Sequence, residues 1–170
     1  MNTLKNALTK LIIAMFSLPN KQIAIITEWL NQWSNLLMRE KGFRPEFMPR
    51  YNRGDILFVD FGWNIGSEFG GVHYAAVLES NNNKTSGTIL VIPLTSLDSG
   101  KQPNPHEVYL GTGIIPWADS LETTAKPNQI RAISKMRILK PVKKKDKRAK
   151  LSPVHLDAID VKIKELLFAK

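Results

Sequence analysis

Two stretches near the start of the chain carry apolar residues at helical spacing. The first extends from Leu4 to Met15, and the second from Ile23 to Leu37 has apolar residues three or four positions apart. This spacing draws one apolar stripe along a helix, and Gly42 supplies a stop. The pattern predicts a helical hairpin within residues 1–50. The hairpin either packs on the domain that follows or forms a seam for a second subunit.

The pattern changes near Arg50 to short runs of β-branched and aromatic residues, which glycine, proline and asparagine separate. Such runs predict strands. We expect them at residues 56–61, 74–78, 88–95, 107–110, 129–133 and 137–141. Short strands in this number favour a small closed or nearly closed barrel, because closure removes exposed strand edges.

The end of the chain predicts one more helix. Ser152 and Pro153 have the character of an N-cap followed by proline at the first helical position, and an apolar face continues from Leu156 to Leu166. This helix most simply covers the barrel. The predicted fold class is therefore α+β and mainly β, with a helical extension at 1–50 and a barrel domain with its terminal helix at 51–170.

Composition narrows the possible chemistry. The chain has 170 residues, no cysteine and three scattered histidines. The absence of cysteine excludes a disulfide framework, a thiol nucleophile and a sulfur-based zinc site, and it favours a reducing cytoplasm. We expect no metal and no cofactor. A faint signal-peptide pattern at 11–18 lacks a small-residue cleavage site, and no apolar run approaches the ~20 residues needed to cross a bilayer, so we expect no membrane association.

The formal net charge of +9 is unevenly distributed. Residues 131–150 hold ten basic side chains and one acidic side chain, whereas residues 51–130 hold four basic and eight acidic ones. A polyanion such as nucleic acid is the natural partner for the basic segment. The alternative is a solvated surface loop.

A glycine-rich loop, Gly66-Ser67-Glu68-Phe69-Gly70-Gly71-Val72-His73, brings a titratable side chain to the start of a strand. Gly70 and Gly71 allow the backbone to approach a ligand closely. A tight turn without function is the alternative, because glycine pairs before strands are common.

The order of the motifs along the chain adds a second kind of evidence. The motifs are Arg53-Gly54-Asp55-Ile56, Val59-Asp60-Phe61, the glycine-rich loop, Ala76-Val77-Leu78, Asn82-Asn83-Lys84-Thr85, Val91-Ile92-Pro93-Leu94-Thr95-Ser96 and Gln129-Ile130-Arg131-Ala132-Ile133. This order resembles the PemK/MazF family of bacterial toxin components. The resemblance covers about residues 51–140 and the position of the terminal helix, whereas residues 1–50 lie outside it.

The resemblance implies an SH3-like barrel, a homodimer and a cognate antitoxin partner in the cytoplasm. It also implies a metal-independent endoribonuclease that cuts single-stranded RNA and leaves 2′,3′-cyclic phosphate and 5′-hydroxyl ends. The residues present suit this chemistry, because RNA supplies its own 2′-hydroxyl nucleophile. The protein then needs only to transfer protons and to stabilise charge on the phosphate.

The family's catalytic pair is an arginine directly after the glycine-rich loop and a threonine at the end of the third strand. Thr95 matches the threonine, but His73 stands in place of the arginine and Tyr74 in place of the proline that commonly follows it. We hypothesise that His73 is the general base or acid and that Thr95 donates a hydrogen bond to the scissile phosphate.

Two alternatives to this role of His73 remain open. Loss of the permanent arginine charge predicts a catalytically silent module that binds RNA or an antitoxin. The other alternative is that His73 is a strand histidine without function. An SH3-like peptide-binding domain is a more distant reading, for which the sequence offers no proline-reading aromatic pattern.

Supporting residues lie around the loop. Glu68 either orients His73 or is a solvated turn carboxylate. Arg53 either pairs with Asp55 or reaches phosphate. Trp63 and Phe69 either stack on bases or pack over the barrel mouth. The RNA-binding candidates, all in or near loops, are Arg53, Trp63, Phe69, Gly70, Gly71, Lys84, Lys101 and Gln102.

Overall fold

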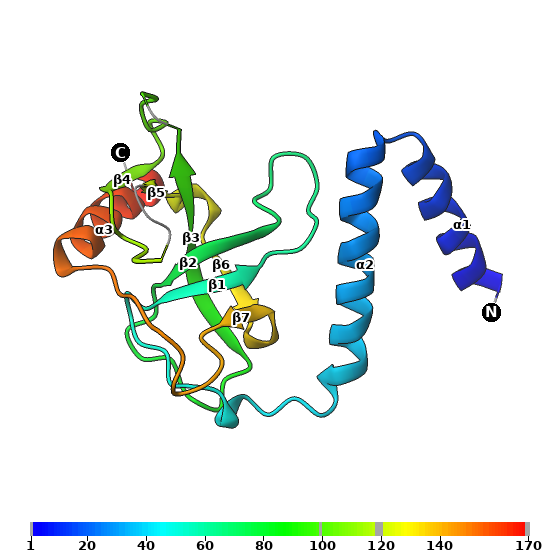
Figure 1. Ribbon diagram of the computed structural model, residues 1–170, viewed down its shortest axis with the longest axis horizontal. Helices are drawn as coiled ribbons and strands as arrows, with labels where there is room; N and C mark the ends of the chain where they lie inside the picture. The colour runs from blue at the N-terminus through cyan, green and yellow to red at the C-terminus, as the bar shows by residue number, and fades with distance from the viewer. Residues whose placement is uncertain (1, 99, 118–120, 169–170) are drawn as a thin grey trace. The chain divides into compact units, whose positions relative to one another are not determined.

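The computed structural model describes residues 2–98, 100–117 and 121–168 and divides the chain into two compact units, one ending at Lys41 and one beginning at Gly42 (Figure 1). The first unit contains α1 (Asn2–Phe16) and α2 (Asn20–Glu40), so both predicted N-terminal helices are confirmed. No described residue of α1 is buried. Whether these helices pack on the barrel or form a seam between subunits stays a prediction, as does the domain boundary at residue 50.

The second unit is an antiparallel sheet with three short 3-10 turns and one helix. Its strands pair in the order β4-β5-β3-β2-β1-β7, and β6 pairs with β3 outside this path. The strands are β1 (Ile56–Asp60), β2 (Val72–Val77), β3 (Thr88–Leu97), β4 (Val108–Gly111), β5 (Glu122–Ala125), β6 (Arg131–Ser134) and β7 (Ile138–Lys140). Six of them were predicted from the sequence, and β5 was not.

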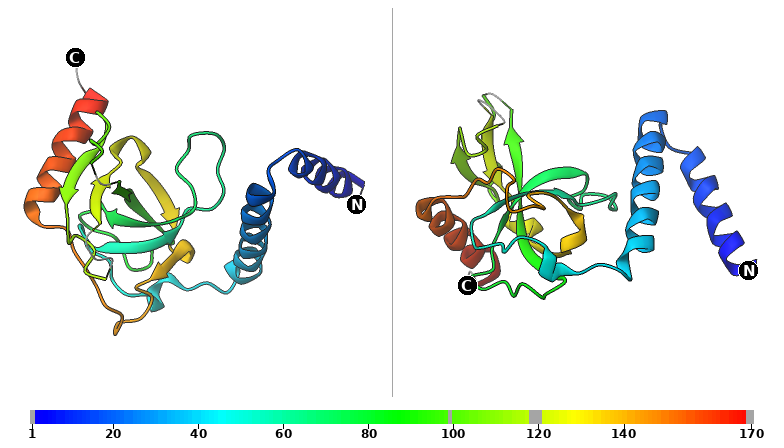
Figure 2. Two further views of the ribbon diagram at one scale, coloured as in Figure 1. Left: turned by 45° about the horizontal axis from the view of Figure 1, so that its top comes forward. Right: turned by 60° about the horizontal axis from the view of Figure 1, so that its bottom comes forward.

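The sheet curls into a barrel around the long strand β3. β6 pairs with the first part of β3 and β5 with its last part, and β2 occupies the other edge. The chain then passes from β6 through the 3-10 turn η3 (Lys135–Arg137) into β7, which pairs with β1 (Figure 2). Five strands thus surround one core. Within the described ranges, the covalent turn η3 joins β6 to β7 and completes the barrel, where a hydrogen-bonded ladder would close an ordinary one.

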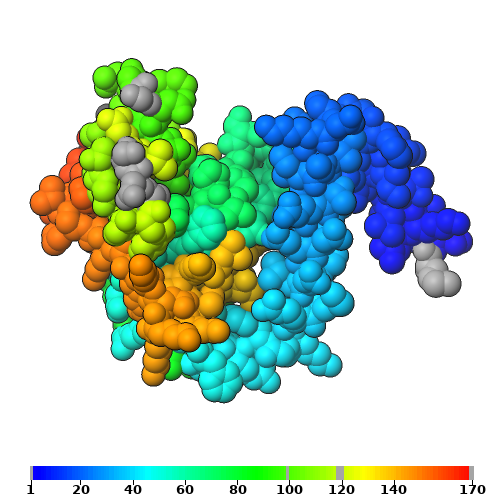
Figure 3. All heavy atoms as spheres, viewed as in Figure 1, coloured from blue at the N-terminus to red at the C-terminus, as the bar shows by residue number. Residues whose placement is uncertain are grey.

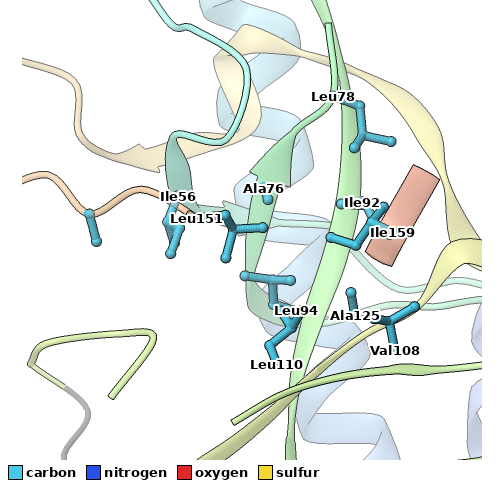
Figure 4. Packing of buried hydrophobic residues seen from close by; sticks show 11 residues of the cluster. Ile56, Ala76, Leu78, Ile92, Leu94, Val108, Leu110, Ala125, Leu151 and Ile159 are labelled. Atoms are coloured by element: carbon cyan, nitrogen blue, oxygen red, sulfur yellow. The ribbon is translucent and has the colours of Figure 1, made fainter. Parts of the chain in front are cut away.

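The two faces of the sheet bury separate apolar clusters, as strand alternation requires. Along β2 and the residue that follows it, Ala75 and Val77 belong to the cluster inside the barrel, whereas Ala76 and Leu78 belong to the cluster on the outer face. The outer cluster contains side chains from β1, β2, β3, β4, β5 and the segment before the last helix (Figure 4). A side chain therefore belongs to the inner or the outer cluster according to the side of the sheet from which it projects.

The last helix, α3 (Pro153–Phe168), covers the outer cluster. Its start matches the prediction, because the His155 backbone N–H donates to Ser152 Oγ at 3.4 Å. Ile159 is fully buried in the outer cluster (Figure 4), and the helix also contacts β4 and the 3-10 turn η2 (Pro127–Gln129). No helix among the described residues is both long and apolar enough to span a membrane.

We expect the Ile159→Ala substitution to lower the free energy of unfolding by about 2–5 kcal/mol, because it leaves a cavity beneath α3. Urea denaturation followed by circular dichroism measures this loss. Val161, which is 55% exposed on the same helix, supplies the control. Val161→Ala is expected to stay within about 0.5 kcal/mol. Equal losses from the two variants would contradict the view that Ile159 anchors α3.

Candidate active site

His73 and Thr95 occupy neighbouring strands on the same face of the sheet. The ladder between β2 and β3 pairs Tyr74 with Leu94, and one further step of this register brings His73 opposite Thr95. Residues directly opposite each other in an antiparallel pair have Cβ atoms about 4.5–5.5 Å apart. Thr124 of β5 pairs with Thr95 on its other side. An imidazole and a hydroxyl that lie far apart in the sequence therefore meet at one place.

Strand alternation places this pair on the barrel-interior face. His73 alternates with Ala75 and Val77, which belong to the interior cluster. A cavity of about 180 Å³ borders the same strand positions. Its lining includes His73 and Thr95 together with Val72, Tyr74, Ser96 and Thr123, so both candidate residues border this cavity.

The His73 ring packs against an aromatic pair at the end of the barrel. Its centroid is 4.5 Å from that of Phe69, which in turn lies 5.3 Å from Phe61 in an edge-to-face arrangement. Burial, followed by the positive charge of Lys126, lowers the pKa of His73 below its ordinary value of 6.5. The imidazole is therefore mostly neutral at pH 7, which is the form that accepts a proton.

The glycine-rich loop is held in place by its own backbone. A Cβ atom on Gly70 would lie 2.8 Å from the Gly62 carbonyl oxygen, and the Gly71 N–H donates to that same oxygen at 2.7 Å. The Gln129 side chain forms two further hydrogen bonds with the loop backbone. Its Oε1 accepts from the Phe69 N–H at 3.1 Å, and its Nε2 donates to the Ser67 carbonyl at 3.4 Å. The close approach at Gly70 is thus to this chain's own backbone.

If the RNA cleavage that the resemblance implies holds for this chain, Gly70→Ala is expected to displace the loop and to lower the cleavage rate by at least about ten-fold, because the new methyl group overlaps a backbone oxygen that cannot move alone. Steady-state cleavage rates measure the loss. Gly87→Ala is the matched control, since nothing lies within 4 Å of its Cβ position. A Gly70→Ala protein with unchanged cleavage would show that the loop position does not matter for activity.

The structure does not join several of the predicted residues to His73. Glu68 is exposed, and within the described part of the chain no hydrogen bond links it to His73. The guanidinium of Arg53 binds the Leu78 carbonyl and Asp160 of α3, rather than Asp55. The remaining RNA-binding candidates outside the glycine-rich loop are the partly buried Trp63, the exposed Lys84 and Gln102, and Lys101, which is exposed and paired with Asp98.

Three residues near His73 were not singled out by sequence reasoning. Lys126 forms an ion pair with Glu107 and acts on the pKa of His73. The Arg131 guanidinium lies 5.7 Å from the Phe61 ring centroid and donates to Gln129 Oε1 at 3.1 Å. Gln129 and Arg131 both lie in a family-like motif, which was the available signal. Lys126, the residue directly before η2, carries no local signal of its own.

No group of three or more potential metal ligands gathers within residues 2–98, 100–117 and 121–168. The basic segment lies on the surface of the barrel unit (Figure 3), and most of its residues from Val142 to Lys150 are exposed. Asp146 orders it, because its Oδ2 accepts from the backbone N–H groups of Val142 and Lys143, each at 2.8 Å. Both interpretations of this segment, as a polyanion contact or as a solvated loop, remain open.

Both a family sequence profile and solved structures are similar to this chain. A sequence profile of the family described as "PemK-like, MazF-like toxin of type II toxin-antitoxin system" matches residues 52–167. Among solved structures, MazF of Deinococcus radiodurans (Form-I) is similar, with a TM-score of 0.52 and 22% identity over 71% of this chain and 96% of that chain. The MazE-MazF structure (Form-II) from the same organism has a TM-score of 0.45 and 19% identity over 72% and 98%.

No curated protein sequence matches this chain. The structural similarity supports the fold, an α+β protein dominated by an antiparallel sheet. The profile match extends from the segment before β1 almost to the end of α3, which is more than half of the chain. The chain therefore belongs to the PemK-like, MazF-like toxin family of type II toxin-antitoxin systems.

Proposed function

We propose that this protein is a toxin-type endoribonuclease that cuts single-stranded RNA without a metal ion and leaves 2′,3′-cyclic phosphate and 5′-hydroxyl ends. The observation that carries the proposal is the register of β2 and β3, which brings His73 opposite Thr95 on one face. Family membership supports the reaction class. The proposal assigns the family's chemistry to a histidine where an arginine is usual.

His73 acts as the general base in this mechanism. Its neutral imidazole accepts the proton of the ribose 2′-hydroxyl, and the 2′-oxygen attacks the adjacent phosphorus. The bond from phosphorus to the 5′-oxygen breaks, and that oxygen takes a proton from water. The lowered pKa of His73 keeps the base form dominant at neutral pH. A histidine suits this step better than an arginine, which stays protonated.

Charge that develops on the phosphate needs donors and cations in place of the family arginine. Thr95 donates a hydrogen bond to a non-bridging oxygen. Lys126, whose charge acts on His73, supplies the positive charge. Arg131, partly exposed beside the aromatic pair, is the second available cation. Phe69 holds the His73 ring by packing rather than by hydrogen bonding.

The proposed partners follow from the family. We expect a cognate antitoxin to bind this chain, because the family description is that of a toxin of a toxin-antitoxin system. We also expect a homodimer that acts in the cytoplasm, and analytical ultracentrifugation of the full chain measures the oligomeric state. Glu68, Trp63, Lys84, Lys101 and Gln102 stay proposed contacts to His73 or to RNA.

The deciding experiment incubates the purified full chain with mixed-sequence RNA in EDTA and then determines the end groups. Cyclic phosphate and 5′-hydroxyl ends support the proposal. Thr95→Val removes the hydroxyl with little change in volume, and Thr85→Val, in an exposed loop between β2 and β3, is its control.

RNA that stays intact at high protein concentration contradicts the nuclease proposal. If the intact RNA still binds, the result supports the alternative function. In that alternative, this chain is a catalytically silent RNA- or antitoxin-binding module that lost its activity with the arginine. Cleavage that requires added Mg²⁺ contradicts the proposed mechanism, because His73 and Lys126 would then not suffice.

A further inference from the structure

Helix α1 exposes a set of large apolar side chains to solvent. None of its described residues is buried, and no described helix or strand packs extensively against it. The exposed fractions of Leu4, Leu8 and Ile12 are 65%, 51% and 52%. Burying such side chains is favourable, and contiguous exposed apolar patches mark interaction sites. The helix therefore presents a surface for a binding partner.

The apolar side chains form one continuous face. With about 100° of rotation per residue, five of them fall within an arc of about 100°. We call these five residues the apolar face of α1, and they are Leu4, Leu8, Leu11, Ile12 and Met15. The opposite side of the helix holds Asn2, Asn6 and Thr9, with Ile13 as an apolar exception. The helix is thus amphipathic, and its binding surface is the apolar face.

The charges beside the apolar face are all positive. On the helical projection, Lys5 lies at one edge of the face, and Lys10 lies on the other side, beyond two alanines. The sequence contains no aspartate or glutamate from its first residue to Thr27. A lysine beside an apolar face can lay its methylene stem along apolar surface and keep its ammonium group in a polar layer. The partner must therefore combine apolar surface with negative charge.

This combination separates the possible partners. RNA offers negative charge but little apolar surface to bury leucines. A second copy of α1 offers an apolar face, but it brings lysines close to lysines, which repel each other. An anionic phospholipid surface offers negative head groups and, directly below them, acyl chains. A basic amphipathic helix lies flat at this boundary. Charge complementarity therefore favours the lipid surface.

We propose that α1 binds the surface of a membrane that contains anionic phospholipids. The apolar face lies at the boundary between head groups and acyl chains, and Lys5 and Lys10 contact the phosphates. The proposal does not depend on RNA cleavage. It departs from the expectation of no membrane association, which concerned a signal peptide and a run that crosses the bilayer. Surface binding needs no such run, and it is compatible with a protein in the cytoplasm, because the helix enters one leaflet only.

The test mixes the purified full chain with vesicles and measures the bound fraction by flotation. One set of vesicles is phosphatidylcholine alone, and the other is equal parts of phosphatidylcholine and phosphatidylglycerol. The chain is expected to bind the mixed vesicles more tightly, by about five-fold for each lysine that meets the surface. Equal binding to the two compositions would contradict the role of the lysines. Failure to bind either composition would contradict the whole proposal.

A double variant tests the apolar face itself. Leu8→Gln combined with Leu11→Gln is expected to weaken binding to the mixed vesicles by at least about ten-fold, because two leucines lose their burial. The matched control is Asn6→Gln combined with Thr9→Gln on the polar side, and it is expected to bind as the wild type does. Both double variants keep the wild-type charge, so the basic segment attracts vesicles equally in all three proteins. Equal binding by all three would place the lipid contact elsewhere and overturn the proposal.

Sedimentation velocity without lipid distinguishes a second copy of the chain from the lipid surface. Both double variants are expected to keep the oligomeric state of the wild type. If only the variant of Leu8 and Leu11 dissociates into smaller species, the apolar face binds another copy of this chain, and the proposal is wrong. Circular dichroism ensures that all three proteins have the same helix content.

Discussion

Replacing His73 with alanine is expected to lower kcat/KM for RNA cleavage by about 10²–10⁴-fold, the range that a positioned general base contributes. The lowered pKa sets the pH dependence. Because His73 must be neutral to accept the 2′-hydroxyl proton, the wild-type rate falls as the pH drops through a pKa that lies below 6.5. Above that value the imidazole is already neutral, so this group adds no further rise. Cleavage rates measured from pH 4.5 to 8 test both statements.

His73→Arg is the informative control, because it restores the family's residue. If His73 acts by proton transfer, the cleavage rate of the His73→Arg protein no longer falls at low pH, since arginine does not titrate in this range. We call this fall of the rate at low pH the acid limb of the pH profile. An arginine protein with the wild-type acid limb would assign that limb to another group. A His73→Ala protein that cleaves as fast as the wild type would remove His73 from the mechanism altogether. Circular dichroism of each variant ensures that the comparison is between folded proteins.

The elements that were predicted correctly carry their signal in local sequence. The stripe from Ile23 to Leu37 and the Ser152-Pro153 cap depend on residues within one or two turns of each other. Strand β5 (Glu122–Ala125) was missed because its four residues are short or polar side chains without an alternating pattern. Its threonines become buried only when the strand inserts between β3 and β4, which is a long-range event.

The same distinction applies to the site. Motif order was the signal that proposed His73 and Thr95, because each lies at a recognisable place in a strand, and their catalytic role stays a prediction. The pairing of Lys126 with Glu107 could not be predicted, since the two are 19 positions apart and meet only in the folded barrel. Arg53 shows the opposite case. Its nearest sequence partner, Asp55, is not the one it binds, because α3 brings Asp160 to the guanidinium.

Lys126→Met is expected to change two observables at once. The cleavage rate falls by about 10²–10³-fold, as for the loss of one preorganised group that stabilises transition-state charge. The acid limb of the pH profile also moves to higher pH, because removing the positive charge raises the pKa of His73 toward its ordinary value. Burial persists in this variant, so the limb stays below 6.5. Lys126→Arg keeps the charge and is expected to hold the limb in place.

Arg131→Met separates a specific effect of Lys126 from a general loss of positive charge. Arg131 lies beside Phe61 and Gln129, and it is not among the groups that shift the pKa of His73. Its removal is therefore expected to slow cleavage without moving the acid limb. If the acid limb moves equally in both variants, Lys126 and Arg131 affect the pKa of His73 to the same extent, through long-range electrostatics. If it moves in neither, Lys126 does not act on His73, and the charge that replaces the family arginine must come from another side chain.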